Sequence, residues 1–150
     1  MRAKGGNNMN WIFSDPLEEV ALIQKFERKI DYQFPEDFRQ CVLKNNGAYA
    51  EPDGFDTDKT EGRAFNHLFS FNPDDVSSIW EAGIGLDETD EACVEVMRNY
   101  VIFADSPCGD PICFDRRDDS VVYVDHETLE VEYVAPSFQA FLDKLYEEDD

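Results

Sequence analysis

The chain has 150 residues, of which 42% are hydrophobic and 13% aromatic, and its 34 acidic against 13 basic side chains give a formal net charge of -21. This length and apolar content favour one globular domain, which we predict at residues 11–150 after a loose tail at residues 1–10. The negative charge opposes binding to nucleic acid or to an anionic membrane, and it favours a basic protein partner.

The cysteines and the N-terminus bear on location and cofactors. Four cysteines form no C-x-x-C pair, and with only two histidines they make no zinc-like ligand cluster. The N-terminal MRAKGGNNMN has basic residues but no apolar run behind them, so we expect neither a signal peptide nor a membrane anchor. We therefore predict a cytoplasmic protein with reduced cysteines, no metal and no other cofactor.

Two helices are predicted in the first 47 residues. The first begins near Asp15, which can cap it, and ends near Asp31. The second lies in FPEDFRQCVLKNNG, residues 34–47, between a proline that presets a helical φ and an Asn-Gly exit. Its apolar stripe is Phe38, Cys41 and Val42. We interpret the second helix as a buried scaffold.

The next stretch, residues 48–62, is polar and acidic, and we predict a mobile surface loop. Phe55 lies inside it and fits no inward-facing period, so we expect this side chain to be an exposed anchor for a partner. A second acidic stretch begins near residue 87. The predicted partner-binding residues of the two stretches are Glu51, Asp53, Phe55, Asp56, Asp58, Glu61, Asp87, Glu88, Asp90 and Glu91.

The middle of the chain predicts a strand at residues 65–71, a helix that opens at residue 72 or 73, and a helix within residues 86–99. The inward-facing residues expected in the first of these helices are Val76, Ile79 and Trp80. Those expected in the second are Cys93, Val94 and Met97.

The final third predicts strands at residues 100–105, 111–115, 121–125 and 129–133, joined by short turns, and then an amphipathic helix capped by Ser137. In the last strand Glu130 and Glu132 alternate with apolar residues, so we expect the glutamates on a solvent-exposed face. The fold class is α+β: a predominantly antiparallel sheet with N-terminal helices and a C-terminal helix packed around it.

Catalytic patterns are weak. The acids that begin at Asp56 fail the EF-hand spacing, because their sixth position is not glycine. Asp125-His126 is compatible with acid–base catalysis, although an Asx-type turn with an exposed imidazole explains the same residues. Neither Ser106 nor Ser137 lies in a G-x-S-x-G context, and there is no glycine-rich phosphate loop. We predict a non-enzyme, with a metal-dependent hydrolase built on the acidic loops as the catalytic alternative.

Four sequence blocks together resemble the SMI1/KNR4 superfamily, also called SUKH. An early helix with an acid before its corner, Glu27, precedes them, and the matches keep the family's order between about residues 17 and 146. Two residues depart from the family's usual pattern. Phe34 stands in place of leucine and affects packing, and Ala48 stands in place of a second glycine and affects a turn. The blocks are FPEDFRQCVLKNNG at 34–47, GDPICFD at 109–115, VVYVDHE at 121–127 and APSFQAFLDKL at 135–145.

The resemblance implies an α+β protein-binding domain, in bacteria most often an immunity protein that neutralises a toxin, frequently a nuclease. We therefore expect a bacterial immunity protein, a monomer or weak dimer, that binds a basic nuclease-type toxin through its acidic loops. The alternative is a regulatory interaction scaffold without a toxin partner, as fungal members resemble. Binding residues vary across such a family, so our site residues are chosen by charge and loop position.

Overall fold

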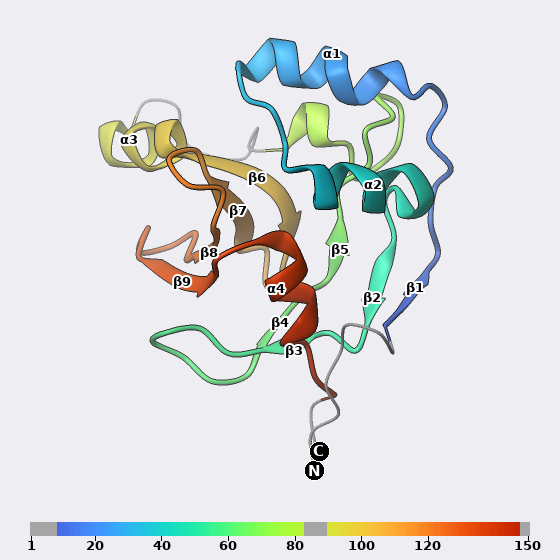
Figure 1. The fold of residues 1–150 in the computed structure, drawn as a ribbon. Coiled ribbons are helices and arrows are strands. Elements are labelled where there is room, and N and C mark those ends of the chain that lie inside the picture. The colour runs from blue at the N-terminus through green and yellow to red at the C-terminus, as the bar shows by residue number, and fades with distance from the viewer. Residues whose placement is uncertain (1–8, 83–89, 148–150) are drawn as a thin grey trace.

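The computed structural model describes residues 9–82 and 90–147. In these residues, four α-helices pack around a seven-stranded antiparallel sheet, with a two-stranded sheet beside it (Figure 1). The helices are α1 (Ala21–Ile30), α2 (Glu36–Asn45), α3 (Glu91–Asn99) and α4 (Phe138–Asp143). In spatial order the large sheet contains β1 (Asn10–Ile12), β2 (Tyr49–Glu51), β5 (His67–Leu68), β6 (Tyr100–Asp105), β7 (Pro111–Asp115), β8 (Val121–Val124) and β9 (Val131–Ala135). The small sheet pairs β3 (Gly54–Phe55) with β4 (Arg63–Ala64). The predicted α+β class is confirmed.

The main core lies between one face of the large sheet and the helices α1, α2 and α4. Phe38 of α2 is at its centre, with its ring centroid 5.3 Å from that of Phe103 and 5.2 Å from those of Phe114 and Phe138. All four side chains are almost completely buried. Such edge-on aromatic packing fixes the helices against the sheet, so the scaffold role predicted for residues 34–47 fits this position.

A smaller cluster covers the opposite face of β7 and β8. Val96 and Met97 of α3 pack against Cys113 and its neighbours there. Alternate residues of a strand point to opposite faces, which is why the almost wholly apolar β7 is buried on both sides. The inward placement predicted for Cys93 is confirmed, but that of Val94 is wrong, because its side chain is exposed.

Glu27 is a buried acid at the corner between α1 and α2. Its Oε2 accepts a hydrogen bond from the backbone N–H of Phe34 at 2.8 Å and lies 3.7 Å from Nε of Arg39. Its carbonyl accepts from the N–H of Tyr32. Asp31 ends α1 in the left-handed conformation. The carboxylate therefore fixes the turn that leads into α2.

The chain entering α1 differs from the prediction. The helix begins at Ala21, without a side-chain cap, instead of just after a capping Asp15. The backbone of Asp15 is bonded to Asn46, because its N–H donates to the Asn46 carbonyl and its own carbonyl accepts from Nδ2 of Asn46, both at 2.8 Å. Residues 1–8 of the predicted tail lie outside the described residues, while Asn10, its last residue, pairs with Glu51.

Residues 48–82 depart most from the sequence prediction. The predicted loop contains β2 and β3, and the predicted helix after residue 72 is only a short 3-10 turn, Ile79–Glu81. Side chains explain the missing helix, since Asn72 donates to the Pro16 carbonyl and Asp75 accepts from both Ser70 and Asn72. Such bonds compete with helical ones. Val76, predicted to face inward, is fully exposed.

Candidate functional site

The acidic loop, residues 56–62 between β3 and β4, lies along the outer edge of β9. The N–H of Asp58 donates to the carbonyl of Tyr133, and Oδ1 of Asp58 accepts from the N–H of Tyr133, both at 2.9 Å. Lys59 Nζ adds contacts to Glu130 Oε1 at 3.1 Å and to the carbonyl of Val131. The loop therefore satisfies backbone groups that an open edge strand would present to other chains.

Glu132 of β9 is buried beneath the acidic loop. It accepts hydrogen bonds from Thr57 Oγ1 at 2.7 Å, Thr60 Oγ1 at 3.1 Å and Arg63 Nη2 at 2.9 Å. Desolvation alone would raise the pKa of Glu132, but the bonds from Arg63 and the two threonines outweigh it and lower the pKa below its ordinary value.

The prediction that Glu132 faces solvent is wrong. The alternation of β9 is as expected, but its buried face carries Glu132 while Tyr133 is exposed. A glutamate is found inside when all its oxygens are paired, and here the donors lie about 70 residues earlier in the chain. Sequence alternation alone did not reveal those donors.

A polar network, defined as Arg63, Asp110, Tyr123, His126 and Glu132, continues from the loop into the sheet. The Arg63 guanidinium lies 4.4 Å from the Tyr123 ring centroid. The Tyr123 hydroxyl donates to buried Asp110, which also accepts from the N–H of His126 at 3.0 Å and from its ring Nδ1. The network thus joins the blocks GDPICFD and VVYVDHE in space.

The network shifts the pKa values of its members. Desolvation, and then the bond to Asp110, raises the pKa of Tyr123 to about 12. For Asp110 itself the desolvation is outweighed by bonds from Tyr123 and His126, so its pKa is lowered. The bond to Asp110 raises the pKa of His126. At neutral pH, Asp110 is therefore a carboxylate that accepts hydrogen bonds from Tyr123 in β8 and from His126 in the turn that follows.

The Asp125-His126 pair forms the predicted Asx-type turn. Oδ1 of Asp125 accepts from the N–H groups of Glu127 at 2.8 Å and Thr128 at 3.0 Å, and His126 is exposed. Asp110, Asp125 and His126 place possible metal-ligand atoms within 4.8 Å of one another, the one such group of three or more in the part of the chain that the structure describes. Hydrogen bonds already account for the side-chain positions of this group.

Among the residues that the structure describes, the predicted partner-binding residues do not lie together. Glu51, Asp53 and Glu61 are exposed near β2, β3 and the acidic loop. Desolvation raises the pKa of Asp53. Asp56 is used internally, because its Oδ1 accepts from the N–H of Gly62 at 3.0 Å and from the Tyr146 hydroxyl.

The second acidic stretch lies elsewhere. Asp90 caps α3 by accepting from the N–H of Ala92 at 2.9 Å, and Glu91 follows in the first turn. In Figure 1, α3 lies above strands β6–β9 and the acidic loop lies below them. Asp87 and Glu88 lie outside the described residues. The two stretches therefore offer two separate negative regions.

The prediction that Phe55 is an exposed anchor is wrong. Its side chain has no exposed area, and its ring centroid lies 5.2 Å from that of Phe141 and 6.1 Å from that of Tyr123. Two backbone bonds between Gly54 and Tyr146 fix the short strand β3 beside the C-terminal end of the chain. Phe55 thus belongs to the core beneath the acidic loop.

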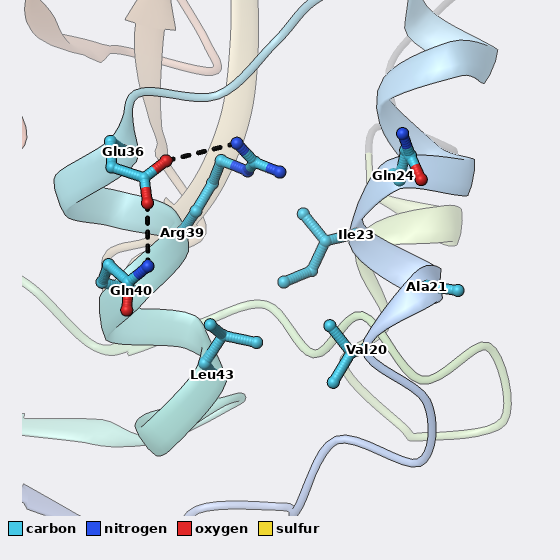
Figure 2. A pocket seen from close by; sticks show the side chains of 8 residues that line it. All are labelled: Val20, Ala21, Ile23, Gln24, Glu36, Arg39, Gln40 and Leu43. Atoms are coloured by element: carbon cyan, nitrogen blue, oxygen red, sulfur yellow. Dashed lines mark hydrogen bonds and ion pairs between the residues drawn. The ribbon is translucent and has the colours of Figure 1, made fainter.

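A groove that the sequence did not indicate lies between α1 and α2 (Figure 2). Its volume is about 170 Å³, and Val20 and Leu43 face each other across it. Glu36 on its α2 side accepts from Gln40 Nε2 at 2.8 Å and from Arg39 Nη1 at 3.3 Å. The sequence signal for the groove was a pair of apolar residues off the buried faces: Val20 immediately precedes α1, and Leu43 lies outside the apolar stripe of α2.

The helices and the sheet, with its loop-covered edge, make the protein an α+β domain. Its composition is strongly acidic. The model of the SMI1 / KNR4 family (SUKH-1) matches residues 19–144, so the chain belongs to this family. The resemblance carried by the four sequence blocks is thereby confirmed. Comparison with curated proteins gave no match. Within residues 9–82 and 90–147, no helix is long and apolar enough to cross a membrane.

Proposed function

We propose that this protein is a cytoplasmic bacterial immunity protein that binds and neutralises a cognate basic toxin of the nuclease type. The supporting observation is membership of the SMI1 / KNR4 family over residues 19–144 in a chain of net charge -21. A nuclease binds a polyanion, so its active surface is basic and is attracted to an acidic inhibitor. Binding alone blocks the substrate groove, and the immunity protein performs no chemistry.

Two groups of acids have different roles in this proposal. Exposed Glu51, Asp53 and Glu61 attract a basic partner over a distance, as do Asp90 and Glu91 near α3 and Asp87 and Glu88 before it. Asp56 and Asp58 hold the acidic loop in place through the bonds described above. Long-range attraction raises the association rate and weakens as salt is added.

A rigid binding surface suits a tight inhibitor. The scaffold is held by the aromatic core around Phe38, and the β9 edge is covered by the acidic loop. A preformed surface loses little conformational entropy on binding, so more of the contact energy appears as affinity. The proposed inhibitor, a monomer or weak dimer, thus occludes the toxin with a preformed surface.

Co-expression with the product of the neighbouring toxin gene tests this function. Cells that express the toxin survive with the wild-type protein and die with an empty vector. Phe38→Asp is the control variant, because a charge in the aromatic core prevents folding and abolishes protection. Equal death with and without the wild-type protein would contradict the function. A neighbourhood without a toxin gene favours a regulatory scaffold instead.

A further inference from the structure

Exposed apolar side chains gather around one connecting segment, residues 13–20 between β1 and α1. Of the seven exposed large hydrophobic residues in the described ranges, five lie on this segment or beside it. Phe13 is 77% exposed and Val20 is 68% exposed. The five are Phe13, Val20, Leu43, Tyr49 and Val76.

Contacts place these residues beside the segment. The ring of Tyr49 meets that of Phe13 edge-on, at 6.1 Å between centroids. Leu43 faces Val20 across the groove between α1 and α2 (Figure 2). The loop that carries Val76 is held next to the segment by Asn72. An eight-residue segment extends at most about 29 Å, which one side of an ordinary protein interface can cover.

Two asparagines fix the backbone of this segment. Asn46 bonds both backbone groups of Asp15, and Asn72 donates to the Pro16 carbonyl and accepts from the N–H of Glu18, both at 2.9 Å. Polar backbone groups are thus satisfied inward while Phe13 and Val20 remain outside. A held backbone with exposed apolar side chains is a preformed surface for binding.

The charge around these side chains identifies the kind of partner. Residues 13–20 contain Asp15, Glu18 and Glu19 and no lysine or arginine. Lys25 lies 3.5 Å from Glu19, and Arg39, which lines the groove with Val20 and Leu43, lies 3.3 Å from Glu36. Apolar anchors with an acidic rim complement a partner that has apolar anchors and a basic rim. A second copy of this chain would instead bring like charges together.

We propose that this surface, which we call the 13–20 face, is where the toxin docks. It consists of Phe13, Val20, Leu43 and Tyr49 with the acids Asp15, Glu18 and Glu19. This inference rests on the proposed function and deepens it by assigning the binding surface. The apolar side chains supply most of the affinity, and the acids orient the basic partner. We place the acidic loop outside the contact, because Asp56 and Asp58 are bonded within the protein and Glu61 attracts the partner only over a distance.

Binding of surface variants tests the 13–20 face. The probe is the purified toxic domain encoded beside this gene, inactivated by substitution at its own active site. We expect the double variant Val20→Ser/Leu43→Ser and the single variant Phe13→Ser each to lose about 30-fold or more in affinity. The matched control is Val94→Ser on α3, an exposed valine outside this surface, which changes affinity less than threefold. Circular dichroism and the unfolding midpoint stay at wild-type values, because every substituted side chain is exposed.

The outcomes separate the surface from the function. If the wild-type protein does not bind the toxic domain, the proposed function is overturned. If it binds, and the double variant binds equally well, only the 13–20 face is overturned. Sedimentation of the free protein provides a second readout. If the wild-type protein is a dimer and the double variant is a monomer, a second copy of the chain occupies this face. That result would overturn the toxin as its occupant.

Discussion

The acidic loop and the segment at residues 13–20 lie near opposite edges of the large sheet, at β9 and β1, and use their side chains in opposite ways. In the acidic loop the polar side chains turn toward the sheet, where Asp58 bonds Tyr133 and Thr57 bonds Glu132. In the other segment the backbone is bonded inward, and Phe13 and Val20 remain exposed.

In this protein, a local concentration of acidic residues is not the same as surface that is available to a partner. The acidic loop is conspicuous in the sequence because it is rich in acids, yet two of these acids satisfy backbone groups of the protein itself. The segment at residues 13–20 is of similar length and also carries three acids, but it presents in addition apolar side chains that are exposed to water. An interface needs unpaired surface, and in this fold the local concentration of acids does not locate it.

The largest expected effect comes from the buried ion pair of the acidic loop. Glu132→Ala leaves Arg63 and two threonines without their acceptor, and should lower the free energy of unfolding by about 2 to 3 kcal/mol. Urea unfolding measures this loss. Glu130→Ala, two positions earlier and exposed, removes only a surface contact with Lys59 and should cost less than about 0.5 kcal/mol. Equal losses from the two variants would show that the loop contacts are not structural.

A smaller effect is expected at the loop tip. Asp58→Ala removes the acceptor for the Tyr133 N–H and should cost about 1 kcal/mol. The Tyr133 amide should then exchange with solvent faster than in wild type, as measured by hydrogen exchange. Glu61→Ala serves as the control because its side chain is exposed. An unchanged Tyr133 exchange rate in Asp58→Ala would mean that the side chain does not cover the β9 edge.

The response to acid follows from the lowered pKa values of Glu132 and Asp110. A group whose pKa is lower in the folded state adds stability above its unfolded pKa, near 4, and this stability is lost as the pH falls through the folded value. The urea concentration at the unfolding midpoint should therefore decrease as the pH is lowered below about 4. Glu132→Gln should show a shallower fall than wild type, and an identical pH profile would contradict the lowered pKa of Glu132.

The contribution of His126 to stability depends on pH in the opposite direction. Its raised pKa means that its contribution to stability is complete below the unfolded value, near 6.5, and is lost as the pH rises through the folded value. Nuclear magnetic resonance titration should give a His126 pKa above that of an unperturbed histidine. In Asp110→Asn the pKa should return toward the ordinary value. A wild-type His126 that titrates normally would mean that Asp110 does not hold the protonated ring.

The smallest expected effect concerns divalent cations. The oxygens of Asp110 accept hydrogen bonds from Tyr123 and His126, and Oδ1 of Asp125 accepts from its own turn. Calorimetric titration with magnesium, calcium or manganese should therefore release no measurable heat and leave the unfolding temperature unchanged. Binding of one equivalent of any of these cations, with a rise in the unfolding temperature, would support the alternative function of a metal-dependent hydrolase.

Sequence periodicity predicted the part of the fold in which neighbouring residues determine structure. Strands 100–105 and 111–115 and the helix capped by Ser137 appear as expected, because their apolar residues follow one period without interruption. The helix expected after residue 72 is absent because Asn72 bonds Pro16, a partner far away in the sequence.

The candidate site was less predictable for the same reason. Phe55 lies in a polar stretch, and its burial depends on a strand contact with Tyr146. Glu132 is inside because Arg63 and the threonines of the loop pair with it. Charge composition predicted an acidic surface but not which acids remain available to a partner. Exposed Phe13 and Val20 emerged only from the tertiary structure.

Hydrogen exchange of the protein, free and bound to the inactivated toxic domain, tests the account most directly. Bound toxin should slow the exchange of those amides in residues 13–20 and in the C-terminal turn of α2 that exchange measurably in the free protein. Residues 56–62 should keep the exchange rates of the free protein. Slower exchange confined to residues 56–62, with residues 13–20 unchanged, would contradict the assignment of the docking surface.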